Sequence, residues 1–453
     1  MYKFSINEIV LATKGKLLKK NSNQEITYIS LNSNDIKENT LFIPIIGEVN
    51  DGHKFMESAY QNGCRTFLID KNHKFNKEDI NLIRVKDTTK SFGYISKYYK
   101  NKFNIQYIGV TGSVGKTSTK DMIYSVLNQK YKTLKNEGNF NNEIGVPKTL
   151  LNLDNTIEKA VIEMGMSYKG EIKHLANIVE PKIAIISNIG MSHIEHFKNQ
   201  EGIFKTKMEI TTNFTKDNIL IVNGDDKFLK TLKTKKLKYK LLTYGFEKDN
   251  DIYCNNYKIN EEKIDFSCII NNKEEKFTIP TPAKHNILNA LAAILVGLEN
   301  NIEIKDIKKG LKHFELTKMR LDIFKTDKYR IINDTYNASC DSMISALNVL
   351  KNYKDRRVAI LGDIFETGVY EEKIHRTIGD NVKDNTDILI TIGKSSKYIY
   401  DEAIKKGFNK NNAYHFDTKE SFIKQKDKII KAKDTILLKA SRGMALETLI
   451  DQL

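Results

Sequence analysis

Residues 111–117 read Thr-Gly-Ser-Val-Gly-Lys-Thr, the clearest local pattern in the chain. They follow the apolar run Ile105–Thr111 and precede the amphipathic segment Thr117–Gln129, so the pattern predicts a strand, a tight turn and a helix. Glycines in such a turn let backbone N–H groups surround phosphate oxygens, and the helix N-terminus attracts the same anion. Lys116 can reach the terminal phosphates of a nucleotide, and the Thr117 hydroxyl can bind Mg²⁺. Val110 stands where the full nucleotide-binding pattern has glycine, so the match is incomplete.

Beyond this motif, short apolar strands alternate with helical stretches. The predicted strands are Ala160–Glu163, Ile183–Ser187, Ile219–Val222 and Lys240–Tyr244. Such alternation predicts a mainly parallel, doubly wound sheet. The last third repeats the pattern and predicts a second, Rossmann-like domain. Its strands are Arg330–Asn333, Arg357–Leu361, Ile388–Ile392 and Thr435–Lys439, and its helices are Ser342–Leu350, Glu371–Val382, Lys397–Lys405 and Met444–Leu449.

The first hundred residues predict a small α/β domain. Its strands are Thr27–Leu31, Leu41–Pro44, Thr66–Ile69 and Ile80–Val85, with a helix at Lys54–Gln61. A length of 453 residues corresponds to about three domains. We therefore expect an α/β protein with a small N-terminal domain at 1–100, a central P-loop-type ATP-binding domain with a mainly parallel sheet at 101–315, and a C-terminal Rossmann-like domain at 316–453.

The chain is strongly basic. Lys and Arg number 73 against 57 Asp and Glu, a formal net charge of +16, which suits either nucleic acid or acidic small substrates. The basic residues are scattered, and the densest cluster, Lys233–Lys240, has no flanking RNA-binding motif, so we expect no nucleic-acid partner. Four cysteines without a C-x-x-C pair, and a beginning without an apolar block, favour the cytoplasm. The longest apolar stretch, Ala290–Leu298, is too short to span a bilayer.

Other polar positions could carry chemistry, although each has a plainer interpretation. Glu163 ends a predicted strand, where doubly wound folds bind ligands, but it could equally be a solvated carboxylate. His193 follows another strand end and could bind a metal, yet a lone histidine is more often structural. His285, Asn286 and Asn289 share one face of an apolar helix and could meet a nucleotide base.

Taken in order, several segments resemble the Mur ligase family of ATP-dependent amide-forming enzymes, over essentially the whole chain. They are Phe42–Gly47, Asp51–His53 with Phe55, the motif at 111–117, Asn139–Pro147, Asn333–Ala338, Leu361–Asp363 and Leu438–Met444. The resemblance implies that the first domain holds a uridine nucleotide substrate, the second binds ATP and the third closes over both. Within the family, the set resembles ligases that join D-alanyl-D-alanine to UDP-N-acetylmuramoyl-tripeptide through an acyl phosphate. A monomer without stable membrane insertion is also implied.

The resemblance also implies roles for individual residues. Lys116, Lys207 and His193 are the implied catalytic residues. Lys207 matches a lysine that CO₂ converts to a carbamate, although its segment Gly202–Ile210 alone predicts a helix with surface lysines. Carbamylation needs the neutral amine, so burial and nearby cations must lower the lysine pKa from about 10.4. The implied ligands of two Mg²⁺ sites are Thr117, Glu163, His193 and carbamylated Lys207.

Contacts to both substrates follow from the same resemblance. The implied ATP contacts are Thr111, Gly112, Ser113, Val114, Gly115, Lys116, Thr117, Ser118, His285, Asn286, Asn289, Arg320 and Asp334. The implied contacts to the other substrates are Ser33, Asn139, Asn141, Asn142, Tyr336, Asn337, Ser441 and Arg442.

The chain departs from the family pattern at a few positions. It has Asn32-Ser33-Asn34 where the family has Asp-Ser-Arg, Lys284 and Met319 in place of glycines, and Cys340 in place of proline. These changes concern binding contacts and leave the implied catalytic groups intact. Two alternatives stay open: a sister Mur or folylpolyglutamate-type ligase that adds a single amino acid, and an inactive nucleotide-binding scaffold. The segments Asn139–Pro147 and Tyr336–Ala338 favour the D-alanyl-D-alanine ligase.

Overall fold

The computed structural model describes residues 3–47, 50–315 and 317–453, which form two compact units. The first unit comprises residues 3–47, 50–109, 132–166 and 170–181, and the second comprises residues 110–131, 167–169, 182–315 and 317–453. Residue 316, where we predict a domain join, lies outside the described residues. Across the described ranges, no helix is both long enough and apolar enough to cross a membrane.

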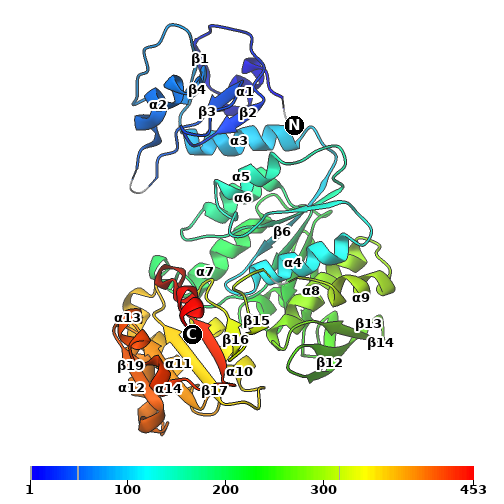
Figure 1. The fold of residues 1–453 in the computed structure, drawn as a ribbon. Coiled ribbons are helices and arrows are strands. Elements are labelled where there is room, and N and C mark those ends of the chain that lie inside the picture. The colour runs from blue at the N-terminus through cyan, green and yellow to red at the C-terminus, as the bar shows by residue number, and fades with distance from the viewer. Residues whose placement is uncertain (1–2, 48–49, 316) are drawn as a thin grey trace. The chain divides into compact units, whose positions relative to one another are not determined.

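The first unit begins with a five-stranded sheet of order β1-β5-β4-β3-β2 (Figure 1). Its strands are β1 (Lys16–Lys19), β2 (Tyr28–Ser30), β3 (Thr40–Phe42), β4 (Thr66–Ile69) and β5 (Asn81–Arg84), and its helices are α1 (Ile6–Thr13), η1 (Gly52–Phe55), α2 (Met56–Gln61) and α3 (Thr88–Lys100). Strands β2 to β5 run parallel, which confirms the predicted α/β pattern. The antiparallel edge strand β1 was not predicted, because its Lys-Leu-Leu-Lys sequence is only partly buried.

The remainder of the first unit contains the parallel strands β7 (Thr133–Lys135) and β8 (Lys159–Glu163), with helices α5 (Gly145–Leu150) and α6 (Glu171–Val179). Strand β6 (Gln106–Thr111) leads from the first unit into the second. Beyond their first residues, β6 and β8 are buried throughout, as is typical of parallel strands covered on both faces. Thr111 and Glu163 therefore stand at carboxyl ends of strands, where open α/β sheets bind ligands.

In the second unit, β9 (Ile183–Ile186), β10 (Ile219–Asn223) and β11 (Lys240–Gly245) are parallel neighbours, as predicted. An antiparallel ribbon then follows that the sequence did not predict: β12 (Ile252–Ile259), β13 (Ile264–Ile270) and β14 (Lys273–Ile279). Four consecutive residues of β12, 255–258, are exposed, so the apolar alternation of a strand is broken there. Figure 1 shows α4 (Lys116–Leu127) beside α8 (His285–Glu299) and α9 (Ile304–Lys312).

The C-terminal part of the second unit has a six-stranded sheet of order β15-β16-β20-β17-β18-β19. The strands are β15 (Asp322–Lys325), β16 (Arg330–Asn333), β17 (Arg357–Gly362), β18 (Ile388–Ile392), β19 (Ala413–Phe416) and β20 (Thr435–Lys439). The helices are α10 (Cys340–Leu350), α11 (Glu371–Gly379), α12 (Lys397–Lys405), α13 (Lys419–Ile423) and α14 (Lys426–Ile429). All neighbouring strands are parallel except β15 with β16. The predicted α-helix at 444–449 is wrong: two 3₁₀ segments, η7 (Arg442–Met444) and η8 (Leu446–Gln452), are separated by Ala445 at φ 47°.

Candidate active site

The glycine-rich turn between β6 and α4 depends on two glycines with positive φ. Gly112 has φ 152°, and a Cβ atom on it would collide with the Ser187 hydroxyl. Gly115 has φ 80° at the N-cap of α4, and a Cβ atom on it would lie 2.9 Å from Asn289 Oδ1. Residues with a side chain rarely adopt these conformations, so both positions require glycine. The turn thereby packs closely against the end of β9 and the first turns of α8.

Asn188, directly after β9, anchors this turn. Its Oδ1 accepts a hydrogen bond from the Val114 N–H at 2.9 Å, and its Nδ2 donates to the Val114 carbonyl at 2.9 Å. Its own carbonyl accepts from the Ser113 N–H at 3.1 Å. The Ser187 hydroxyl also donates to the Val114 carbonyl, at 2.6 Å. We did not predict Asn188 as a site residue. Its sequence signal is a Ser-Asn pair at the end of a buried strand.

Two hydroxyl groups of the turn are buried without a hydrogen-bond partner among the described residues. Within the described ranges, the Thr111 and Ser113 hydroxyl oxygens and Arg320 Nε are buried without a hydrogen bond. Buried polar groups rarely stay unsatisfied unless a ligand or water meets them. Lys116 Nζ donates to the carbonyls of Gly112 at 3.0 Å and of Ser113, so the cation lies across the turn. This combination suits an anionic, nucleotide-like ligand.

Lys207, the last residue of α7 (Gln200–Lys207), is only 3% exposed. Burial and the nearby charge of Lys116 lower the pKa of its ammonium group well below the ordinary lysine value. A lowered pKa favours the neutral amine, which is the form that carbamylation by CO₂ requires. Lys205, by contrast, is exposed and pairs with Glu201 at 2.7 Å. The plain interpretation of surface lysines holds for Lys205 and is wrong for Lys207.

His193 lies in the segment that follows β9 and precedes η2 (Ile194–His196). Its Nδ1 atom contacts the carboxylate of Glu366, from the C-terminal part of the unit. The hydroxyl of the preceding Ser192 donates to the Ser113 carbonyl at 3.3 Å, which ties this segment to the glycine-rich turn. Thr117, in the first turn of α4, is buried. A hydroxyl oxygen and an imidazole nitrogen are both suitable ligands for a divalent cation.

Glu163 ends β8 in the first unit and is only 1% exposed. Asn141 Nδ2 donates to Glu163 Oε1 at 2.8 Å. Asn136, which was not predicted, donates from Nδ2 to the Glu163 carbonyl at 3.0 Å and accepts the Glu163 N–H at 2.9 Å. Asn139 and Asn142 are exposed, and Asn142 Oδ1 accepts a backbone N–H from the start of α5 at 2.9 Å. The structure thus places one predicted substrate residue, Asn141, against the predicted metal ligand Glu163.

Asn286 and Asn289, predicted to face a nucleotide base, form a buried hydrogen-bond chain. Asn289 Nδ2 donates to Asn286 Oδ1 at 2.8 Å, and Asn286 Nδ2 donates to the Thr281 hydroxyl at 3.2 Å. The Thr119 hydroxyl donates to Asn289 Oδ1 at 3.0 Å. These hydrogen bonds join α8 to α4, and Asn289 packs against Gly115 of the glycine-rich turn.

A buried ion pair lies where β16 and β20 end. Lys439 is 2% exposed, and its Nζ donates to Asp334 Oδ2 at 2.6 Å and to the Asn337 carbonyl at 3.0 Å. Asp334 Oδ1 accepts the Leu321 N–H at 3.1 Å. Burial lowers the pKa of the neighbouring His285 to about 4, so its imidazole is neutral at pH 7. We did not predict Lys439 as a site residue; its signal is a single lysine at the end of an apolar strand.

The predicted residues around this pair are placed in different ways. The Arg320 guanidinium lies over the Tyr336 ring, 4.0 Å from its centroid. Met319 has φ 62°, which explains the glycine that the family has there. The buried Ser441 hydroxyl accepts a backbone N–H from the loop after β17 at 2.9 Å. Arg442 is exposed and pairs with a nearby glutamate at 2.6 Å.

In the first unit, Ser33 follows β2 and its carbonyl accepts a hydrogen bond from Asn62 Nδ2 at 2.8 Å. Ser33 itself is buried. The backbone N–H of Asn34 donates to Asn32 Oδ1 at 3.0 Å. Local hydrogen bonds therefore shape the segment in which the family arginine is replaced.

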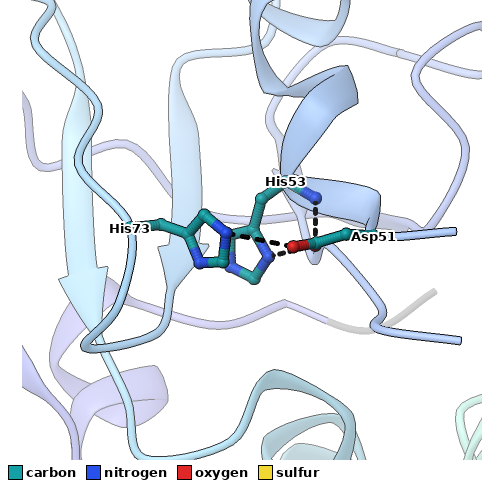
Figure 2. Close-up of side chains that lie close together, drawn as sticks. All are labelled: Asp51, His53 and His73. Atoms are coloured by element: carbon teal, nitrogen blue, oxygen red, sulfur yellow. Dashed lines mark hydrogen bonds and ion pairs between the residues drawn. The ribbon is translucent and has the colours of Figure 1, made fainter.

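Two histidines stack beside Asp51 in the same unit (Figure 2). The His53 and His73 ring centroids are 3.8 Å apart, and His53 Nδ1 and His73 Nε2 contact the Asp51 carboxylate at 2.7 and 3.0 Å. A hydrogen bond to Asp70 at 2.7 Å raises the pKa of His73. The Asp70 N–H points at His53 Nε2 at 3.4 Å, which places the His53 proton on Nδ1. These contacts join the segment Asp51–His53 to the loop that carries His73.

Two segments of the chain match family models. Residues 110–297 match the Mur ligase middle domain, and residues 319–442 match the domain described as Mur ligase, glutamate ligase domain. The chain is 37% identical to the UDP-N-acetylmuramoyl-tripeptide–D-alanyl-D-alanine ligase of Bacillus subtilis (strain 168), over 100% of this chain and 99% of that protein. The chain belongs to the Mur ligase family. The predicted family is therefore confirmed.

Two further similarities extend over nearly the same length. This Mur ligase is 35% identical to the UDP-N-acetylmuramoyl-tripeptide–D-alanyl-D-alanine ligase of Buchnera aphidicola subsp. Baizongia pistaciae, over 94% of this chain and 92% of that protein. The crystal structure of MurF from Acinetobacter baumannii superimposes with a TM-score of 0.93 at 27% identity, covering 100% of this chain and 99% of that one. The predicted α/β fold class is likewise confirmed.

Proposed function

We propose that this Mur ligase joins D-alanyl-D-alanine to UDP-N-acetylmuramoyl-tripeptide in an ATP-dependent, ADP-forming reaction. The product is the UDP-N-acetylmuramoyl-pentapeptide used for peptidoglycan. Both relatives described above carry this activity in their names. The structural observation that supports it is the glycine-rich turn: in the described ranges it offers buried polar atoms without internal partners, beside Lys116 and in the unit that buries Lys207.

The reaction has two halves. The carboxylate at the end of the tripeptide takes the γ-phosphoryl group of ATP, giving an acyl phosphate and ADP. The amine of D-alanyl-D-alanine then attacks the acyl carbon, and phosphate leaves through a tetrahedral intermediate. Phosphoryl transfer depends mainly on positioning and charge neutralisation, so we assign it to Lys116 and the turn Thr111–Ser118. The nucleotide side of the site would comprise His285, Asn286, Asn289, Arg320 and Asp334.

Thr117, Glu163, His193 and carbamylated Lys207 would hold two Mg²⁺ ions. The donor set fits, because hydroxyl, carboxylate and imidazole groups are metal ligands and a buried neutral lysine can react with CO₂. Bound Mg²⁺ would neutralise charge on the transferred phosphoryl group. Within the protein, burial lowers the pKa of the Lys207 ammonium group and so favours its neutral amine, and the hydrogen bond from Asn141 would orient the Glu163 carboxylate.

We assign the three predicted segments to three tasks. Residues 1–100 would bind the uridine nucleotide, with Ser33 at the site, residues 101–315 would bind ATP, and residues 316–453 would close over both. The peptide contacts would be Asn139, Asn141, Asn142, Tyr336, Asn337, Ser441 and Arg442. A net charge of +16 supports strongly anionic substrates through long-range attraction. We also propose that the enzyme is a monomer and acts in the cytoplasm.

The test is ADP release with MgATP and UDP-N-acetylmuramoyl-tripeptide, with and without D-alanyl-D-alanine, and a mass measurement of the product. Tripeptides ending in meso-diaminopimelate and in L-lysine are compared, because the better substrate identifies the third residue. Dipeptide-dependent turnover with the mass of the pentapeptide supports the proposal. Turnover only with a single amino acid on a shorter precursor would instead indicate a sister ligase. Nucleotide binding without turnover for any acceptor would indicate a scaffold.

A further inference from the structure

A loop after β17 packs along the segment that carries His193. We call these the 364–370 loop and the 193–198 segment. Three contacts follow one another along the loop and the segment. Glu366 contacts His193, and a Cβ atom added to Gly368 would lie 2.9 Å from the Glu195 Cβ. The Tyr370 hydroxyl donates to the Lys198 carbonyl at 3.4 Å. The C-terminal part of the second unit therefore reaches the segment that holds the proposed metal ligand.

Both residues of this contact, His193 and Glu366, have left-handed backbone conformations. The φ angle is 60° at His193 and 59° at Glu366. Residues other than glycine adopt this region rarely and at an energetic cost, and such residues concentrate at functional sites. Within the described part of the chain, His193 Nδ1 contacts the Glu366 carboxylate and has no hydrogen-bond partner elsewhere. The Glu366 carboxylate is thus the charged group placed against Nδ1 of the imidazole.

An imidazole that binds a cation through one nitrogen is usually held by a carboxylate at the other nitrogen. We propose that Glu366 is a positioning residue for His193: its carboxylate accepts the Nδ1 proton, so the Nε2 lone pair is left for Mg²⁺. This inference rests on the proposed function. The proposed role of His193 as a metal ligand does not by itself require a residue from the C-terminal part of the unit. The consequence is that the metal site is complete only when the 364–370 loop is docked.

The first readout is the His193 tautomer, measured without any metal or substrate. Histidine-selective ¹⁵N NMR at pH 8.5 reports which ring nitrogen carries the proton, and His193→Asn identifies its signals among the nine histidines. We expect the Nδ1–H form in the native enzyme and a shift toward the Nε2–H form in Glu366→Ala. Glu366→Gln keeps a carbonyl acceptor and should retain more of the Nδ1–H form. An Nε2–H form in the native enzyme would overturn the proposal.

The second readout is Mn²⁺ binding, followed by electron paramagnetic resonance with an ATP analogue present. Loss of such an orienting carboxylate weakens metal binding about 10- to 100-fold, which we expect for Glu366→Ala. Two control variants should bind Mn²⁺ as the native enzyme does. Glu372→Gln removes a nearby carboxylate that pairs with Arg376 instead, and Tyr370→Phe removes the hydrogen bond to Lys198 without touching the imidazole. Equal Mn²⁺ affinity in Glu366→Ala and Glu372→Gln would overturn the proposal.

Circular dichroism confirms folding before either measurement. The two readouts also separate this inference from the proposed function. An enzyme that never accepts D-alanyl-D-alanine, yet shows the Nδ1–H form and the Mn²⁺ loss, would refute the proposed acceptor and leave the role of Glu366 intact. Normal ligase activity with an unchanged tautomer in Glu366→Ala would do the opposite.

Discussion

Replacing Lys439 with methionine removes one member of the buried pair at the ends of β16 and β20. Lys439 is 2% exposed and donates to the Asp334 carboxylate at 2.6 Å and to the Asn337 carbonyl at 3.0 Å. Methionine fills a similar volume. Among the described residues, it leaves the Asp334 carboxylate with only the hydrogen bond from the Leu321 N–H, at 3.1 Å. An uncompensated buried charge of this kind costs about 3–5 kcal/mol, so the free energy of unfolding should fall by that amount.

Urea unfolding followed by far-UV circular dichroism measures this loss, because the chain has no tryptophan to report it by fluorescence. Lys406→Met is the matched control: its pair with Asp380, at 2.8 Å, is half-exposed and should contribute only about 0.2–1 kcal/mol. The double variant Asp334→Asn/Lys439→Met should be more stable than Lys439→Met, because no unpaired charge is left. A loss for Lys439→Met no larger than that for Lys406→Met would refute the reasoning.

Gly112→Ala should weaken ATP binding by at least about 10-fold and destabilise the protein by about 1–3 kcal/mol, because its Cβ would collide with Ser187. Isothermal calorimetry measures the loss of ATP affinity. The control is Gly138→Ala, a positive-φ site where a Cβ atom would meet open space. Lys207→Met should abolish turnover yet unfold at a higher temperature than the native enzyme in CO₂-free buffer, and bicarbonate should raise only the native melting temperature. His73 has a raised pKa in the folded state, so the stability it contributes is complete below about pH 6.5 and is lost as the pH rises through the folded-state pKa. The difference in melting temperature between the native enzyme and His73→Asn should therefore be larger at pH 5.5 than at pH 8.5. An equal difference at the two pH values would contradict this.

Local sequence predicted the parts of the fold that depend on short-range chemistry. The strand, turn and helix around Gly112 and Gly115 follow from conformations that only glycine adopts easily, next to an apolar run. Strands such as Ile388–Ile392 are almost entirely apolar and were predicted with their observed bounds. Strand β12 was missed because four of its residues in a row are exposed. The helix at 444–449 was mispredicted because Ala445 takes a left-handed conformation that its residue type does not indicate.

The candidate site shows the same division. By itself, the sequence determined the turn that suits phosphate, the strand-end position of Glu163 and the family, because these depend on neighbouring residues or on the order of motifs. Only the tertiary structure decided that Lys207 is buried while Lys205 is exposed, that Lys439 pairs with Asp334, and that Glu366 reaches His193. The physical reason is that a lysine or glutamate looks the same in sequence whether water or protein surrounds it. Burial and a distant charged partner, which set its pKa and its role, arise only when separate segments pack together.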